Sequence, residues 1–561
     1  MSERLRMCNF CCTFVARFGT RVCDVCACML REMKEPRSER EEKMPEQGEN
    51  RENIQQGMPQ GVVQQPMPPR MMQGGGLQRR AKAPSIWPKW LTQYAVGVYL
   101  AALAIVTVIY SSYSLPWYYM LSGIVAVMVF FLYGSTVVKS TAIDKIRKVK
   151  NFEKRIFLIA FVPRLIWVIL IYTIFMQTYG DAFGFENADA SYYNNLGQFV
   201  ASIISDGNFH FHDEISKWCG NDDISDMGYG VYVGFIYWLT GNSIIAVRLL
   251  KCVWSSITVL LIYRLAKRNF GDQTARIAAI FCALWPNFWY YCSAHLKETE
   301  MVFLSVLFVE QADQMLRSKQ FTAWKVIPIL LIAAAIFTFR TPLGLVALLA
   351  LVFSVVMSSS RVVSWGKRVV VGFWAILLIG IVAGNQLEER AQELLEQAEG
   401  GNKDNMEWRS RREHGNAFAK YAGSAVFAPM ILTIPFPTMV RPFEGQEVQQ
   451  LNHGGNFIKN ILSGFTLLAL VMLLLSGKWR EHLLPLSFVV GYLIVLVFSS
   501  FAQAERFHQP VMPFELMFAA YGLSIALSHK RYKRWYMYWC ALTFVAAIAW
   551  NWFKLAGRGL A

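Results

Sequence analysis

The chain has 561 residues, of which 54% are hydrophobic and 14% aromatic, and its mean hydropathy is +0.31. Water-soluble domains rarely reach this apolar content, so composition excludes an ordinary soluble enzyme and predicts a polytopic membrane protein. The formal net charge is +16. Lys and Arg lie mostly in short segments between apolar runs, which is the topology pattern of membrane proteins and excludes nucleic acid as the partner.

Residues 1–85 are predicted to form a cytoplasmic tail, and we expect no cleavable signal peptide because an apolar core is lacking there. Four cysteines have the spacing of a structural zinc site: Cys8, Cys11, Cys23 and Cys26. Two alternatives stay open, namely a reduced tail without metal and a true start at Met33 or Met44. Residues 34–80 are rich in Glu, Gln, Pro, Met and Gly, so we expect them to be disordered.

Apolar runs predict about thirteen transmembrane helices, since about 18 or more apolar residues cross a bilayer core of roughly 30 Å. The predicted spans are residues 90–110, 116–138, 156–175, 244–266, 274–292, 300–316, 326–339, 342–357, 369–383, 457–475, 483–498, 511–527 and 535–552. With these spans every strongly basic loop falls on one side, which predicts a cytoplasmic N-terminus and fits an inner (plasma) membrane. The shorter runs 229–240 and 421–439 are interpreted as interfacial or re-entrant helices on the outer side.

The same topology places two large polar loops outside the cytoplasm, at residues 177–227 and 385–456. Shorter polar elements reach that face as well. Basic side chains on these elements are candidates to bind a lipid phosphate: Lys297, Arg340, Arg441 and Arg506. A carboxylate at the same face can act as a general base towards an acceptor hydroxyl or amine. Glu298 and Arg340 lie at predicted span ends, where an ionisable group is costly unless it has a function.

Three segments carry a recognisable pattern. They are ADASYYNNLGQFVASIISDGNF, which contains Asp189, residues 229–304, which begin with YGVYVGFIYWLTG and contain Glu298, and ERFHQPVMPFELMFAAYGL, which contains Arg506. In this order they resemble the GT-C superfamily of membrane glycosyltransferases. The similar branch includes protein O-mannosyltransferases and the lipid A aminoarabinose transferase. The resemblance implies an all-α, GT-C-like bundle at residues 156–528, whose outer loops carry short interfacial helices. Two additional helices and a basic loop at 86–155 precede this core, and a C-terminal helix at 529–561 follows it.

The resemblance also implies roles for individual residues. Asp189 matches the first-loop acid, which acts as catalytic base or orients the acceptor, and Glu298 matches the second acidic position. Arg506 matches a late arginine near the donor phosphate, whereas Lys297, Arg340 and Arg441 are supported by charge alone. Many family members have two adjacent acids in the first loop, but Ala190 follows Asp189 here. Other first-loop residues are therefore kept as rivals or substrate-binding candidates: Asp181, Glu186 and Tyr192.

The implied function is transfer of a sugar from a polyprenyl-phosphate donor to an envelope glycan, lipid or protein acceptor on the extracytoplasmic face. Membrane lipids are the other expected partners, and no cofactor is required. His210, His212 and Asp213 form an HxHD sequence that could bind a metal, but we predict none, since loop histidines are commonly just solvated. The alternatives are a polysaccharide polymerase or ligase that uses lipid-diphosphate glycans, and a transporter or flippase, which would predict internal repeats.

Overall fold

The computed structural model describes most of the chain after residue 85. The described residues are 86–146, 152–219, 225, 227–318, 323–359, 362–366, 368–370, 372, 373, 380, 430–441, 447–498, 504–528 and 531–560. The predicted cysteine tail and most of the loop at 385–456 lie outside these residues, as does most of the predicted span 369–383.

The described residues are helical, apart from turns and one isolated bridge between Ser114 and Val440. Six of the described helices are long and apolar enough to cross a membrane: Lys89–Ile109, Trp117–Ser140, Phe152–Tyr179, Ile244–Phe270, His453–Leu475 and Arg531–Ala556. Four shorter apolar helices accompany them: Val326–Phe339, Thr341–Met357, Leu483–Val497 and Met512–Ser528. The predicted all-α polytopic membrane protein is therefore confirmed, while the number of thirteen spans stays a prediction.

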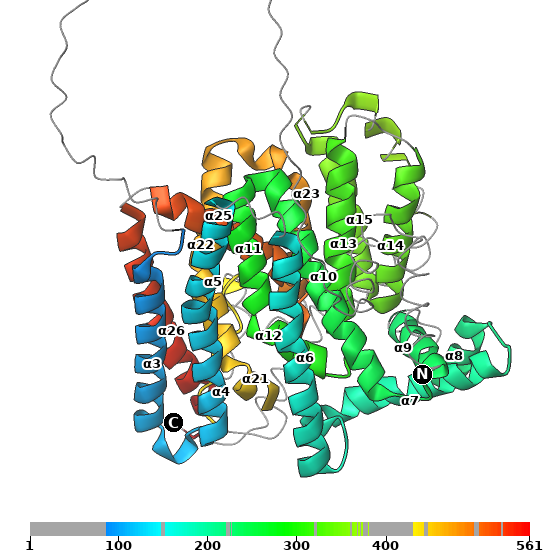
Figure 1. Ribbon diagram of the computed structural model, residues 1–561, viewed down its shortest axis with the longest axis horizontal. Coiled ribbons are helices and arrows are strands. Elements are labelled where there is room, and N and C mark those ends of the chain that lie inside the picture. The colour runs from blue at the N-terminus through cyan, green and yellow to red at the C-terminus, as the bar shows by residue number, and fades with distance from the viewer. Residues whose placement is uncertain are drawn as a thin grey trace, which may run out of the picture. The chain divides into compact units, whose positions relative to one another are not determined.

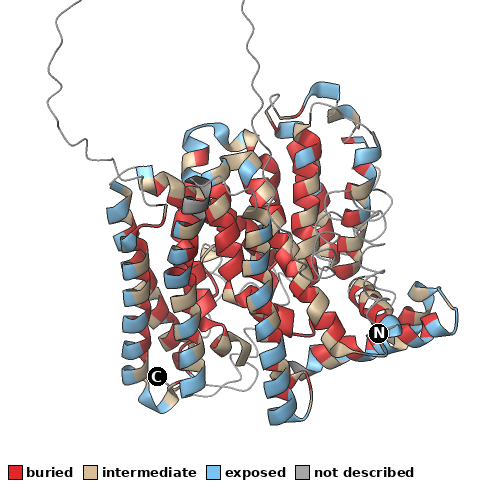
Figure 2. Ribbon diagram, viewed as in Figure 1, coloured by how far each residue is buried: buried red, intermediate tan, exposed pale blue. Residues whose placement is uncertain are grey.

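The terminal helices pack together at one edge of the bundle. Helix α26 (Arg531–Ala556) runs along α3 (Lys89–Ile109), and α4 (Trp117–Met128) follows α3 in the chain (Figure 1). Figure 2 shows exposed residues along the outward faces of α3, α4 and α6 (Phe152–Tyr179). Many of these exposed side chains are large and apolar, as Val108 and Ile166 are. Such a surface is expected where a helix faces lipid.

Close helix contacts in the interior depend on glycine. Helix α22 (His453–Leu475) packs against α25 (Met512–Ser528), and a Cβ atom added at Gly522 would lie 1.9 Å from the carbonyl oxygen of Phe465. At Gly123 on α4, an added Cβ would lie 2.2 Å from the ring of His453. Small residues let the backbones of membrane helices approach closely, so these positions allow the bundle to form.

The predicted single helix over 274–292 is wrong in one respect, because the structure breaks it into α11 (Asp272–Leu284) and α12 (Pro286–Ser293). Pro286 has no N–H to donate and forces Trp285 into an extended conformation. The buried guanidinium of Arg164 on α6 donates to the carbonyls of Cys282 and Ala283, each at 3.0 Å. It also bonds Ser255 on α10 (Ile244–Phe270) at 2.8 Å. This arginine satisfies carbonyl groups that the break leaves without helix partners.

A second group of helices packs on the far side of α10. It comprises α13 (Glu298–Arg317), α14 (Val326–Phe339), α15 (Thr341–Met357) and α23 (Leu483–Phe498) (Figure 1). At the end where α10 and α13 carry basic residues, Arg268 bonds Glu310 at 2.7 Å and Asp313 at 3.1 Å. These ion pairs join helix ends that the charge pattern assigns to one side of the membrane.

Short helices form the opposite end of the helical bundle that the described residues build. Helix α9 (Met227–Thr240), predicted as an interfacial or re-entrant helix, packs against α7 (Asn187–Ser205) and α14. Helix α8 (Phe211–Cys219) adjoins α7 and α9. Two more short helices, α21 (Glu447–Leu451) and α24 (Glu505–His508), precede α22 and α25. The chain thus reaches this end repeatedly, and the candidate site lies among these short elements.

Candidate active site

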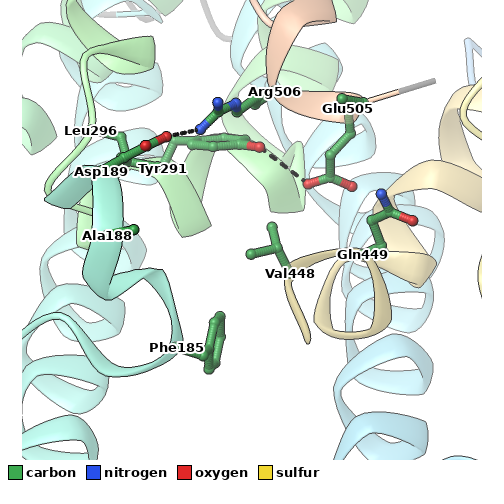
Figure 3. A pocket seen from close by; sticks show the side chains of 10 residues that line it. Phe185, Ala188, Asp189, Tyr291, Leu296, Val448, Gln449, Glu505 and Arg506 are labelled. Atoms are coloured by element: carbon green, nitrogen blue, oxygen red, sulfur yellow. Dashed lines mark hydrogen bonds and ion pairs between the residues drawn. The ribbon is translucent and has the colours of Figure 1, made fainter. Parts of the chain in front are cut away.

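A cavity of about 310 Å³ lies where five segments meet. It is lined by the turn η3 (Gly184–Glu186), the first turn of α7, the region of α12, helix α21 and the start of α24 (Figure 3). Asp189, Glu505 and Arg506 are its charged side chains. Phe185, Tyr291 and other lining residues add aromatic and apolar surface, so the cavity combines a few charges with carbon-rich walls.

Asp189 and Arg506 form an ion pair on one wall of the cavity, in which Arg506 Nη1 donates a hydrogen bond to Asp189 Oδ2 (Figure 3). Asp189 lies in the first turn of α7, and Arg506 lies on α24. Their side chains keep 51% and 38% of their surface exposed, so both can still reach a ligand. The sequence-predicted base and the sequence-predicted phosphate ligand therefore touch.

Tyr193 lies one helical turn after Asp189 and faces the same charged cluster. It is buried, and Lys297 Nζ lies 5.9 Å from its ring centroid. Burial raises its pKa, with Glu298 and then Asp189 adding to the rise. Tyr192, which the sequence analysis selected, instead places its hydroxyl 3.3 Å from Cys219 Sγ and is not among the cavity residues. The sequence analysis missed Tyr193. The available signal was its spacing of four residues from Asp189, because residues four apart share a helix face.

Two further cations lie next to the ion pair. Lys297 is buried and donates from Nζ to the carbonyl oxygen of Phe339 at 3.0 Å. The guanidinium carbons of Arg340 and Arg506 lie 4.2 Å and 4.8 Å from the ring centroid of Phe507. Burial, followed by the charge of Arg340, lowers the pKa of Lys297 to about 7. A lysine in this state gains a full charge when an anion arrives, because an anion favours its protonated form.

Glu298 lies beside Lys297 and begins α13. Its side chain is only 3% exposed, and its Oε2 has no hydrogen-bond partner among the described residues. Glu298 contributes to the electrostatic environment of Arg506, as does Asp189. Asp189, Glu298, Lys297, Arg340 and Arg506 therefore form one charged cluster, although their segments are far apart in the chain.

Glu505 is a cavity residue that the sequence analysis missed. It is buried and accepts hydrogen bonds from Asn452 Nδ2 at 2.7 Å, Asn456 Nδ2 at 2.8 Å and the Tyr291 hydroxyl at 3.3 Å. Burial raises its pKa to about 7, although these hydrogen bonds oppose the rise. The available signal was its position directly before Arg506, but a carboxylate beside an arginine in a sequence is more commonly a solvated pair.

The remaining candidates lie outside the cavity or outside the described side chains. Asp181 Oδ1 accepts the N–H groups of Phe183 and Gly184 at 2.7 Å and 2.8 Å, so it shapes the turn after α6. The backbone N–H of Arg441, whose side chain is exposed, bonds the Tyr113 carbonyl at 2.8 Å, next to the α3–α4 connection. Glu186 ends η3, and its side chain is not described.

The HxHD sequence lies at the start of α8 and the turn before it. His212 Nδ1 and Asp213 Oδ1 are 3.5 Å apart, and both side chains are exposed. Among the described residues, no group of three His, Cys, Asp or Glu side chains is arranged to hold a metal ion. The four tail cysteines of the zinc hypothesis lie outside the described residues.

Part of the chain matches the sequence pattern of a known protein family. Residues 230–384 match the family described as dolichyl-phosphate-mannose-protein mannosyltransferase. The matched segment contains Lys297, Glu298 and Arg340, whereas Asp189, Glu505 and Arg506 lie outside it. A comparison with curated proteins finds no match. The family match confirms the resemblance to the GT-C superfamily and supports a membrane glycosyltransferase of that type.

Proposed function

We propose that this protein transfers a sugar from a polyprenyl-phosphate donor to an acceptor, in the cavity between α7 and α24 on the extracytoplasmic face. The observation that carries the proposal is the ion pair of Asp189 and Arg506 in that cavity. A transferase of this kind needs a base for the acceptor next to a cation for the leaving phosphate. These two groups meet here at the junction of distant segments.

The donor phosphate is bound by Arg506, with Lys297 and Arg340 adding positive charge. Arginine suits this role because its planar guanidinium bonds phosphate oxygens in pairs. Arg441 is omitted, since it lies at the α3–α4 connection and not in the charged cluster in which Lys297 and Arg340 accompany Arg506. The polyprenyl tail leaves the cavity between helices towards lipid.

Asp189 takes the proton of the acceptor hydroxyl or amine. The acceptor atom forms a bond to the anomeric carbon as the bond from that carbon to the phosphate oxygen breaks. The bonding electrons leave with the phosphate, and cationic side chains stabilise the developing negative charge. A single displacement of this kind inverts the anomeric configuration.

The test uses the purified full chain in lipid nanodiscs with isotope-labelled donors. We expect release or transfer of the sugar from polyprenyl-phosphate-mannose or another polyprenyl-phosphate monosaccharide. Turnover confined to polyprenyl-diphosphate oligosaccharides would overturn the proposal in favour of a polymerase or ligase. Uptake of an intact lipid-linked sugar without cleavage, measured in proteoliposomes, would overturn it in favour of a transporter.

A further inference from the structure

The cavity has two chemically different sides. On one side lie Asp189 and Arg506, with further cations next to them. On the other lie Glu505 and Gln449, with Tyr291 between the two sides (Figure 3). A phosphate on the Glu505 side would meet a carboxyl group away from Arg506, the cation among the lining residues, and this disfavours it. A neutral, hydroxyl-rich group meets no such penalty there.

Glu505 is held in a fixed position. Its three hydrogen bonds come from Asn452 just before α22, Asn456 on α22 and Tyr291 on α12, and its side chain is only 3% exposed. The two oxygens of a carboxylate offer about four acceptor positions, so the three bonds leave it able to accept from a ligand. Position and remaining hydrogen-bonding capacity both favour recognition of a hydroxyl group.

Gln449 supports the same interpretation from a different element. It is half-buried on α21, and its Oε1 accepts a hydrogen bond from Lys554 Nζ on α26 at 2.9 Å. This bond orients the amide and leaves its nitrogen as a donor towards the cavity. A carboxyl group, an amide and the aromatic rings of Phe185 and Tyr291 together resemble the mixture of polar and apolar surface that fixes a polar ligand in a pocket.

We propose that Glu505, assisted by Gln449, binds hydroxyl groups of a sugar ring in this cavity. Helix α24 then recognises two parts of the substrate with consecutive residues, because Arg506 binds the phosphate and Glu505 binds the sugar. The inference rests on the proposed function and extends it to sugar recognition. The sugar belongs either to the donor or to a glycan acceptor, and the experiment separates these sources.

The first arm measures binding of polyprenyl phosphate and of polyprenyl-phosphate-mannose to the full chain in nanodiscs. Glu505→Gln is expected to weaken binding of the mannose-bearing lipid about 10-fold, while the affinity for the bare lipid phosphate stays within about 2-fold of the wild-type value. The donor ratio is the affinity for the mannose-bearing lipid divided by the affinity for the bare lipid phosphate. Gln449→Ala, at a half-buried position, is also expected to lower this ratio. Glu515→Gln is the matched control, since Glu515 is also buried but does not line the cavity. It should leave the ratio unchanged.

The second arm measures the KM of methyl α-mannoside as acceptor. A rise of about 10-fold in Glu505→Gln, with an unchanged donor ratio, would assign the bound sugar to the acceptor. An unchanged donor ratio together with an unchanged acceptor KM would overturn the inference. Equally weaker binding of both lipids to Glu505→Gln would also overturn the inference, because this result would show that Glu505 only supports the structure. If neither lipid bound the wild-type protein, the proposed function itself would fail.

Discussion

Asp189 and Arg506 form an ion pair although 317 positions separate them in the chain. This pairing implies an exchange of partners during the proposed reaction. Arg506 pairs with Asp189 before the donor binds, and a donor phosphate competes for the same guanidinium. Donor binding then releases the carboxylate to accept a proton, so the base becomes available when the leaving group is in place.

Replacing Asp189 with Asn should separate chemistry from binding. We expect sugar transfer to fall by about 100-fold or more, because an amide does not accept the acceptor's proton. Polyprenyl phosphate should bind at least as tightly as in the wild type, since Arg506 loses a competing carboxylate. Asp213→Asn in the exposed start of α8 serves as control and should transfer sugar normally. Wild-type turnover in Asp189→Asn would remove this residue from the mechanism.

Binding of the lipid phosphate should depend on pH through Lys297, whose pKa is lowered to about 7. Its ammonium group is charged below that pH and neutral above it, so the affinity for polyprenyl phosphate should fall as pH rises from about 6 to about 8. Lys297→Arg should flatten this dependence, because a guanidinium stays protonated throughout the range. The test is to measure the affinity of both proteins for polyprenyl phosphate at several pH values across this range. Equal slopes would show that another group is responsible.

Glu505 should make stability depend on pH. Its pKa is raised from 4.5 to about 7, so the folded protein holds this proton more tightly than the unfolded chain does. The resulting stability is fully present below pH 4.5 and is lost as pH rises through about 7. Glu505→Gln should therefore become more stable relative to wild type between pH 5 and pH 8, by up to roughly 3 kcal/mol.

Melting temperatures of both proteins across that pH range provide the measurement. Gln449→Ala alters the same cavity side without removing a titrating group, so its melting temperature should follow the wild-type dependence. Parallel curves for Glu505→Gln and wild type would contradict the role assigned to this carboxyl group.

Replacing Arg164 with Met should destabilise the junction of α11 and α12. The change removes the donor of the Cys282 carbonyl in an apolar interior, whereas the Ala283 carbonyl keeps the N–H of Trp289 at 3.0 Å, so we expect a cost of about 2 kcal/mol. A lower melting temperature at every pH is expected. Arg480→Met is a suitable control, since Arg480 is exposed and its guanidinium carbon lies 5.1 Å from the ring centroid of Trp479. Equal melting temperatures for the two variants would refute this account of the buried arginine.

The individual helices were largely predictable, because an apolar run in a membrane must satisfy its backbone within a helix. The turn at Arg340 between α14 and α15 follows the prediction, and a helix forms at α9 as expected, while its interfacial position stays a prediction. The break before Pro286 could have been read from the proline itself, since proline removes a donor and restricts its neighbour. The prediction of one helix there gave hydropathy more weight than the proline.

The site was predictable only in part. Asp189 and Arg506 were found through the resemblance to the GT-C superfamily. Tyr193 could have been found from its spacing of four residues from Asp189 on one helix. Glu505 could not be selected from its neighbours in the chain, because Asn452, Asn456 and Tyr291 come from other helices. Its burial and its raised pKa exist only after those helices pack.

The amino-acid sequence by itself determined that this is a helical membrane protein, since hydropathy and helix formation act over short stretches of chain. It also supplied the acid and the arginine of the candidate site. The tertiary structure alone decided that these two groups touch, that burial beside Arg340 lowers the pKa of Lys297, and that Glu505 lines the same cavity. Electrostatic effects depend on distance through space and on burial, and neither is set by position along the chain.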